Sequence, residues 1–533
     1  MSYETNEAWD AATRTFDAWD EHTVVAPPPS YKRSLAGPLS FLLPVLISGV
    51  SYIAGGIPLI TDLAFLTLTV LCVIFCFREM LTFSHRMGIG AILIYGGVLI
   101  WFCHDYMTNW FWHDFRQVNP FFDGVTPSVV ARAAFYHCLF VDLMLVALRI
   151  PLARWVDRLV VIVPEPASGQ FFLGLVIVVL LFGWSAFFAA EDPIYIAIPR
   201  GALWWILGPV KFNVWRTGNV NYNWGGYVAQ IIQVGQIGGI IAAFYAISVA
   251  RSLPGKVFGW CVWAYWFMFS LAGERRGEIA FMALPIIGLL FVRYHALATA
   301  QFRRYRIWAF AVTLAVSLAA LYAVQWQTAD RTNAEDVQLF RASGNTMFSE
   351  GLRAWGIIPE VHGYAEDEFP GETLIRPLPD TLWWFLVGPI PRALWHDKPT
   401  ESFSLWYSGF ISGDSRGVDT AGVAGTTVSG GAVGAWYFRY GPAGVIQGAL
   451  LYGWLMGVAE RALRRANGRP MALLFALAFA TFMFRCYRDL WWHNLYPVMI
   501  AAVILWVLIR LFFSGERIHE AVAGEPIGTL SEA

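Results

Sequence analysis

The chain has 533 residues, of which 57% are hydrophobic and only 14% are charged, and its mean hydropathy is +0.51. A soluble domain is close to half apolar and about a quarter charged, so this composition excludes an ordinary soluble protein and indicates lipid as the natural solvent. The net charge is -1, and no global positive field therefore points to nucleic acid as a partner.

Residues 1–34 precede the first apolar segment and are rich in Asp and Glu. A secretory signal would begin with basic residues and a short apolar run, whereas Arg14 is the only Lys or Arg before residue 31. We expect this segment to be a cytoplasmic N-terminal tail.

Apolar segments long enough to span a membrane follow along the chain. A spanning helix needs about 20 predominantly apolar residues, and twelve candidates begin near residues 38, 62, 88, 133, 170, 225, 257, 277, 307, 440, 470 and 490. The apolar segment 201–210 is too short to cross, so we expect it to lie at the membrane interface or to enter the membrane and return to the same side. The sequence thus predicts an all-α polytopic membrane protein with about 12 transmembrane helices.

The spans define the organisation of the chain. Residues 35–325 carry the first nine predicted helices, residues 429–513 carry the last three, and residues 514–533 form a C-terminal tail. Between the two helical parts lies one large hydrophilic loop, residues 326–428, and loops of this length are usually functional. Its many Trp, Pro and Gly residues predict short helices against the membrane surface.

The distribution of Lys and Arg predicts the orientation, because short cytoplasmic loops collect them. With both termini inside, the inner side holds nineteen Lys and Arg residues and the short outer loops hold ten. Those ten are Arg116, Arg132, Arg200, Lys211, Arg216, Arg275, Arg276, Arg439, Arg485 and Arg488. The bias predicts cytoplasmic termini and an outward 326–428 loop, periplasmic if the cell is Gram-negative.

The six cysteines all lie in or beside apolar segments, so we expect small buried residues rather than a disulfide framework or a zinc site. His137 and Asp142, inside the fourth span, are interpreted as satisfying each other or a neighbouring helix. Nucleotide-binding Gly-rich loops and the His-Glu-x-x-His motif are absent from the sequence. Neither a cofactor nor a metal is expected.

Arg275 and Arg276 lie in a very short outer connection between two spans, against the insertion bias. Two Arg side chains at the outer membrane surface suit bidentate recognition of phosphate or pyrophosphate. The alternative is that they pair with Glu274 and Glu278 on either side.

The second charged group lies in the proline-stiffened segment 389–401 of the large loop. Its members are Arg392, His396, Asp397, Lys398 and Glu401. A rigid loop with two cations, an imidazole and two carboxylates could hold an anionic ligand beside a proton acceptor. The alternative is a solvated turn whose charges satisfy one another.

The third group lies at the outer turn between the last two predicted spans. Arg485, Arg488 and Asp489 fall within one helical turn, so their side chains can project together. Arg341 is one of several charged residues upstream in the large loop. The residues alone do not rank these groups.

Three places in residues 270–495 resemble the oligosaccharide repeat-unit polymerases, the O-antigen polymerase or Wzy-type family. Residues 390–399, IPRALWHDKP, resemble the family's Pro-Arg-x-Leu-Trp-Pro-x-Lys-Pro stretch, with His396 where proline is usual. The aromatic run and glycines of residues 436–444, which include Arg439, resemble the start of a family helix. Arg275-Arg276-Gly277 resembles the arginine that opens a span before the large loop. Some family members carry an Arg followed by a Gly eleven positions later in their outer loops, and this spacing is not found here.

The resemblance implies a reaction on the outer face of the bacterial inner membrane. A glycan would pass from an undecaprenyl-pyrophosphate-linked donor to a lipid-linked acceptor, with no cofactor. Arg392, Lys398, Glu401, Asp397 and His396 are then the candidate catalytic residues, and Arg275, Arg276, Arg341, Arg439, Arg485 and Arg488 the candidate binding residues for pyrophosphate or glycan. Membrane lipids and a chain-length regulator are the further partners implied.

Two other classes remain open. An O-antigen ligase-like enzyme would share the donor and the topology and differ in its acceptor. A transporter would show ionisable residues near mid-membrane and Gly- or Pro-broken helices in corresponding positions of two halves.

Overall fold

The structure is a computed structural model. It describes residues 36–81, 88–103, 106–107, 126–150, 163, 169–188, 225–272, 281–290, 390, 395, 431–466, 469–487 and 503–513. These residues are all-helical and contain no strand, which confirms the predicted fold class. Of the large loop only Ile390 and Trp395 are described, so the short helices predicted there lie outside the described residues.

The helices follow the predicted apolar segments. Their bounds are α2 (Ala36–Ile53), α3 (Pro58–Leu81), α5 (Ile89–Val98) continued by the π-helix η1 (Leu99–Cys103), α7 (Pro127–Ala147), α9 (Gly169–Phe188), α11 (Gly225–Ser248), α12 (Leu253–Ala272), the short helix Phe281–Leu290, α18 (Gly431–Arg465), α19 (Pro470–Arg485) and residues 503–508 continued by the π-helix η3 (Ile509–Phe513).

Within the described residues, three helices are long and apolar enough to cross a membrane: Pro58–Met80, Pro127–Ala147 and Gly441–Arg465. Shorter apolar helices accompany them. The predicted span near residue 307 lies outside the described residues, and the total of twelve stays a prediction.

Proline sets the start of two of these helices. α3 begins at Pro58 and α7 at Pro127, several residues before the starts predicted from hydropathy. Proline suits the first turn of a helix because the missing N–H would have no partner there. In α7 the Thr126 hydroxyl accepts a hydrogen bond from the Val129 N–H at 3.4 Å.

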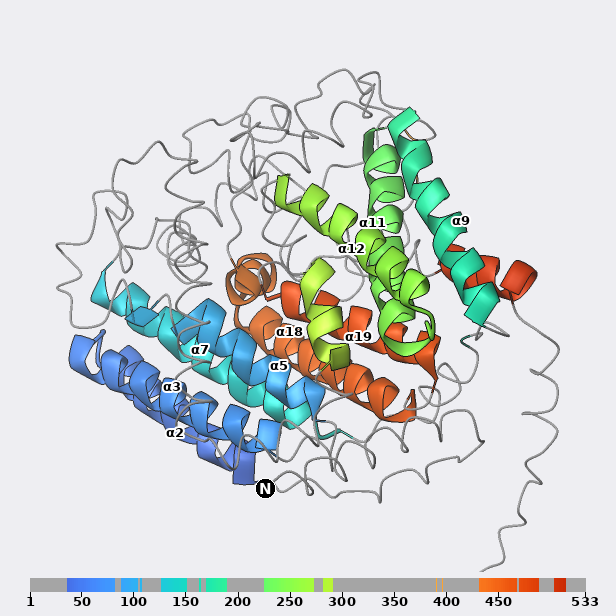
Figure 1. Cartoon of the computed structure of the whole chain (residues 1–533). Helices are drawn as coiled ribbons and strands as arrows, with labels where there is room; N and C mark the ends of the chain where they lie inside the picture. The colour runs from blue at the N-terminus through green and yellow to red at the C-terminus, as the bar shows by residue number, and fades with distance from the viewer. Residues whose placement is uncertain are drawn as a thin grey trace, which may run out of the picture.

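One group of helices packs around α7, which lies between α2 and α18 (Figure 1). α3 and α5 complete this first bundle, whose core includes Phe41, Phe65 and Tyr452. The backbones of α7 and α18 come close together: a Cβ built on Gly453 would lie 2.2 Å from the Met144 carbonyl oxygen.

A second group contains α9, α11 and α12 (Figure 1). α9 and α12 each pack on α11, and Trp266 of α12 is fully buried in the core of this group. The Gln236 amide donates to the Ser270 hydroxyl at 3.0 Å, and that hydroxyl donates to the Trp266 carbonyl oxygen, also at 3.0 Å. α19 contributes to both cores, so it connects the two groups.

The outward faces of α2 and α3 carry large apolar side chains. The exposed ones are Leu39, Leu42, Leu43, Leu46, Val50 and Ile53 on α2, and Leu59, Leu63, Leu66, Val70, Val73, Ile74, Phe77 and Met80 on α3. A soluble protein rarely exposes so continuous an apolar surface. The surface suits helices that face lipid.

Neighbouring helices of the first bundle run in opposite directions, so their ends meet at two opposite ends of the bundle. The backbone of Gly56, in the α2–α3 turn, lies against that of Pro127, while Gly37 lies near Arg149. We name these opposite ends the Pro127 end and the Arg149 end. Gly90 contacts Met456. The second half of α18 therefore runs toward the Arg149 end, and the beginning of α18 lies nearer the Pro127 end.

Candidate functional site

The structure describes few of the residues predicted to carry function. Arg275, Arg276, Arg341, Arg392, His396, Asp397, Lys398, Glu401 and Arg488 lie outside the described residues. Arg439 lies in the first segment of α18, and Arg485 is the last residue of α19. Only the backbone position of these two is described.

α18 consists of two helical segments that meet at Gly441. Gly441 has φ 60° and ψ -150°, a left-handed conformation that favours glycine, and Pro442 follows it. In Figure 1 the first segment is seen nearly end-on, whereas the second runs across the view. The Trp436 ring covers Gly448 in the second segment, where a built Cβ would lie 2.6 Å from the ring. The glycine-rich aromatic run that suggested a family therefore forms a sharp change of helix direction.

The first segment of α18 is buried although it follows directly on the hydrophilic loop. Residues 431–436 are all buried. The Ala432 N–H donates a hydrogen bond to the Tyr487 carbonyl oxygen at 3.0 Å. Tyr487 lies two residues beyond Arg485, so the segments that carry Arg439 and Arg485 meet inside the first bundle.

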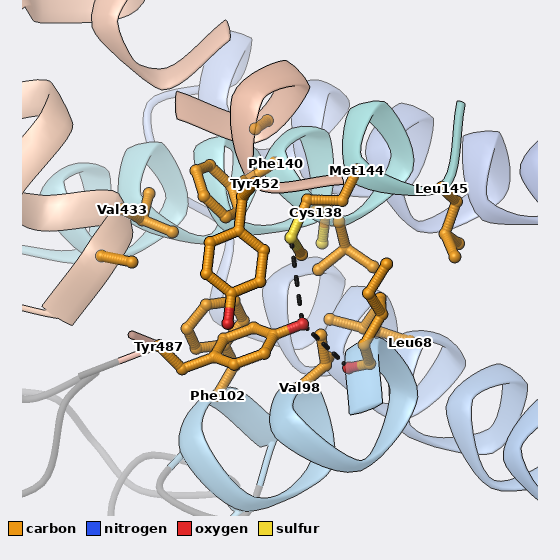
Figure 2. Close-up of a cluster of buried hydrophobic side chains, with 14 of the residues drawn as sticks. Leu68, Val98, Phe102, Cys138, Phe140, Met144, Leu145, Val433, Tyr452 and Tyr487 are labelled. Carbon is orange, nitrogen blue, oxygen red and sulfur yellow. Dashed lines mark hydrogen bonds between the residues drawn. The ribbon is translucent and has the colours of Figure 1, made fainter. Parts of the chain in front are cut away.

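Tyr487 holds this junction on the rest of the bundle. Figure 2 shows its hydroxyl between the Ile94 carbonyl oxygen, at 3.1 Å, and the Met144 sulfur, at 3.8 Å. Its ring lies edge-on to Tyr452, with centroids 4.8 Å apart, and against Gly97. One side chain thus links the end of α19 to α5 and α7.

A cluster of polar aromatic side chains and one cation lies between this junction and the Pro127 end. It contains Tyr52 of α2, Arg132 and Tyr136 of α7, and Tyr437 of α18, and we call it the Arg132 cluster. The Tyr136 and Tyr437 ring centroids are 5.1 Å apart, and Phe135 stacks on Tyr52 at 5.9 Å. Tyr136 and Tyr437 both interact electrostatically with Arg132 and with Tyr52, so three helices supply the phenol groups of this cluster.

Burial and a nearby cation act in opposite directions on the Tyr437 phenol. Tyr437 lies outside the candidate span Gly441–Arg465. Burial raises the pKa of its phenol, and the Arg132 guanidinium nearby acts in the opposite direction. A neutral phenol beside a cation can bind an anionic oxygen without repelling it.

Sequence reasoning counted Arg132 among the outer cations but did not place it in a site. The available signal was a cation within an apolar span with a tyrosine four residues later, on the same helix face. The partners Tyr52 and Tyr437 come from distant parts of the chain, so only the fold could identify them.

Asp62 is a second polar residue that sequence reasoning missed. It is 6% exposed, and the Tyr106 hydroxyl donates to its Oδ1 at 2.7 Å. Tyr106 is fully buried and stacks on Phe65 with centroids 3.8 Å apart. An acidic residue in an apolar run was the available signal. This carboxyl connects α3 to the chain beyond η1.

His137 and Asp142 do not satisfy each other. The His137 Nδ1 is 2.7 Å from the Ala133 carbonyl oxygen of its own helix, and its ring meets Phe102 edge-on at 4.7 Å. Asp142 lies five residues further along and interacts electrostatically with Arg149. Residues five apart point to different faces of a helix, which excludes the first of the two predicted arrangements.

All six cysteines are free thiols, and most are buried. The described residues contain no group of three or more His, Cys, Asp or Glu that could hold a metal ion.

Comparison of the chain with known protein families, with curated proteins and with solved structures gives no match. The class that the described residues define is an all-helical protein with candidate membrane-spanning helices.

Proposed function

We propose that the protein is an integral membrane glycosyltransferase of the bacterial inner membrane. It polymerises oligosaccharide repeat units linked to undecaprenyl pyrophosphate, on the outer face, to make O-antigen or exopolysaccharide. Both termini and the tails are cytoplasmic, and the 326–428 loop is periplasmic.

One observation carries the proposal: the meeting of α18 and α19 close to the Arg132 cluster. The buried start of α18 follows directly on the large loop, and α19 ends at Arg485. The hydrogen bond between Ala432 and Tyr487 joins the two segments. The start of α18 and the end of α19, which are far apart in the sequence, thus meet in a bundle whose outer helices expose apolar side chains.

The reaction needs charge stabilisation and a base. The acceptor hydroxyl oxygen forms a bond to the anomeric carbon of the donor glycan, and the bond from that carbon to the pyrophosphate oxygen breaks. Undecaprenyl pyrophosphate leaves with the bonding electrons, and the acceptor proton passes to a base.

Arginine suits the leaving group because its planar fork meets two phosphate oxygens at once. We assign Arg275 and Arg276 to the donor pyrophosphate, with Arg341, Arg439, Arg485 and Arg488 as further contacts to pyrophosphate or glycan. In the loop, Arg392, Lys398 and His396 hold the reacting groups, and Asp397 or Glu401 accepts the proton.

Analysis of surface glycan from a strain that lacks this protein tests the proposal. We expect the polymer ladder to disappear while one repeat unit remains attached to its normal acceptor. Loss of the ladder with accumulation of free lipid-linked polymer would instead identify a ligase-like enzyme, which uses the same donor. An unchanged ladder would contradict both functions.

A transporter shares one feature with this structure, the helix broken at Gly441 and Pro442. The described residues show no corresponding Gly-Pro break in the first half of the chain, and paired breaks are typical of transporters built from repeats. The enzyme is therefore the better account of the broken helix.

A further inference from the structure

Three carboxyl side chains are buried in the described helices, each inside a different candidate span. Two of them have a polar partner: the Tyr106 hydroxyl donates to Asp62 at 2.7 Å, and Arg464 forms an ion pair with Glu460. Asp142 of α7 differs, because it is 5% exposed and its Oδ1 has no hydrogen-bond partner among the described residues. An acidic residue placed in a membrane helix costs free energy and generally serves a function.

Helix geometry directs Asp142 toward α2. Phe135, Asp142 and Arg149 are seven positions apart, so they lie along one face of α7. A Cβ built on Gly49 of α2 would lie 3.5 Å from the Phe135 ring, and one built on Gly37 would lie 2.5 Å from the Arg149 guanidinium. Asp142 therefore lies between these two contacts, against the middle of α2. This helix contains no Asp, Glu, Lys, Arg or His, so it supplies no charge to the carboxyl.

The cation on the same face of α7 is engaged elsewhere. Seven residues correspond to a rise of about 10.5 Å along an α-helix, which separates the backbones of Asp142 and Arg149. The Arg149 guanidinium donates a hydrogen bond to the Leu145 carbonyl oxygen and lies against Gly37. It acts on Asp142 electrostatically but does not hydrogen-bond its Oδ1.

The remaining surroundings favour a proton as the ligand of this carboxyl. A divalent cation would need several oxygen ligands, and the described residues contain no group of three or more His, Cys, Asp or Glu that could hold a metal ion. On the α18 side, Met144 lies against Gly453, and Glu460 is seven positions further along and already paired with Arg464. A buried carboxylate without a partner costs much more free energy than the neutral acid, which a bound proton provides.

We propose that Asp142 is a proton-binding site: a carboxylic acid that carries its proton while the first bundle is folded around it. The proposal is independent of the proposed glycan transfer. Asp142 lies five residues before Ala147 and fifteen after Pro127, rises of about 7.5 Å and about 22 Å, so the site is closer to the Arg149 end of the bundle.

Infrared difference spectroscopy tests the proposal on the full-length protein in lipid nanodiscs at neutral pH. A protonated carboxylic acid absorbs at a higher frequency than a carboxylate or an amide. We expect the spectrum of Asp142→Asn to lack one protonated-acid band that the wild type shows. Glu460→Gln is the matched control, since this equally buried but ion-paired group should lose carboxylate bands instead. Loss of carboxylate bands, or no lost acid band, in Asp142→Asn would overturn the proposal.

Chemical labelling provides a second measurement on the wild type, so it holds even if Asp142→Asn does not fold. Dicyclohexylcarbodiimide is an apolar reagent that reacts with protonated carboxyl groups: a carboxyl oxygen bonds to the carbodiimide carbon, and the carboxyl proton passes to a nitrogen. Peptide mass spectrometry should find the adduct on Asp142 and severalfold less on Glu460. Labelling of Glu460 equal to that of Asp142 would contradict a proton held at Asp142. Neither measurement needs polymer synthesis.

Discussion

The backbone N–H of Ala432 and the carbonyl oxygen of Tyr487 lie 3.0 Å apart and join two segments that are 55 positions apart in sequence. Tyr487 is fully buried, and its hydroxyl reaches the Ile94 carbonyl oxygen. The start of α18 and the end of α19 are therefore held together and fixed on α5.

Tyr487→Phe removes the hydroxyl and keeps the ring. We expect a loss of about 0.5–1.5 kcal/mol in the free energy of unfolding, the usual contribution of one buried hydrogen bond. Thermal unfolding of the detergent-purified protein measures it. Val50→Ala, at a 56% exposed position on α2, provides the control and should change the stability less. A Tyr487→Phe protein as stable as wild type would show that the ring alone holds the junction.

Gly453→Ala should disturb the contact between α18 and α7. The added Cβ would lie 2.2 Å from the Met144 carbonyl oxygen, so the helices must separate. We expect a loss of about 1–3 kcal/mol, the range for overpacked cores. Gly96→Ala is the matched control, because a Cβ on Gly96 meets nothing within 4 Å. The same thermal assay compares the two, and equal midpoints would contradict the close packing of α7 on α18.

The orientation of the bundle is tested by cysteine labelling. Ser128 and Ser252 are both exposed, and the predicted topology places them on opposite sides of the membrane. In a Cys261→Ser background, which removes the exposed native thiol, an impermeant maleimide should label Ser128→Cys in intact spheroplasts. Ser252→Cys should react only after the membrane is permeabilised. The reverse pattern would place the large loop in the cytoplasm and remove the basis of the proposed reaction.

The proline-stiffened loop is expected to be catalytic. Arg392→Ala or Lys398→Ala should abolish polymer while the protein stays in the membrane at normal abundance, and Asp397→Asn or Glu401→Gln should lower the rate about 10²- to 10⁴-fold if that carboxylate is the base. Arg353→Ala, a cation elsewhere in the same loop, is the control. Glycan ladders and membrane immunoblots report the outcome. Unchanged ladders in all four variants would make the segment a solvated turn.

Much of the architecture follows from local composition. Apolar runs of sufficient length predict helices because every backbone polar group in lipid must be satisfied within the segment. The helical fold and the approximate places of α2, α3, α5 and α7 were predicted on this basis. The exact starts of α3 and α7 were not predicted, because these helices begin at Pro58 and Pro127, and a proline at the first turn is a signal that hydropathy does not contain.

The candidate site could be predicted only in part. Charge and proline spacing drew attention to Arg275, Arg392 and Lys398, since a cation against the insertion bias is visible in a linear sequence. The Arg132 cluster was not visible in this way. Its tyrosines are separated by up to 385 positions, from Tyr52 to Tyr437, and each alone resembles an interfacial aromatic residue.

The sequence alone indicated an apolar environment, a helical fold and the positions of unusually placed charges. It could do so because hydrophobicity and charge are properties of each residue and its near neighbours. Only the tertiary structure decided which helices pack together, that α18 changes direction at Gly441, and that His137 and Asp142 face different surroundings. These outcomes depend on side-chain shape and on contacts between distant segments. Gly453 against Met144 and Ala432 against Tyr487 exist only once the helices have packed.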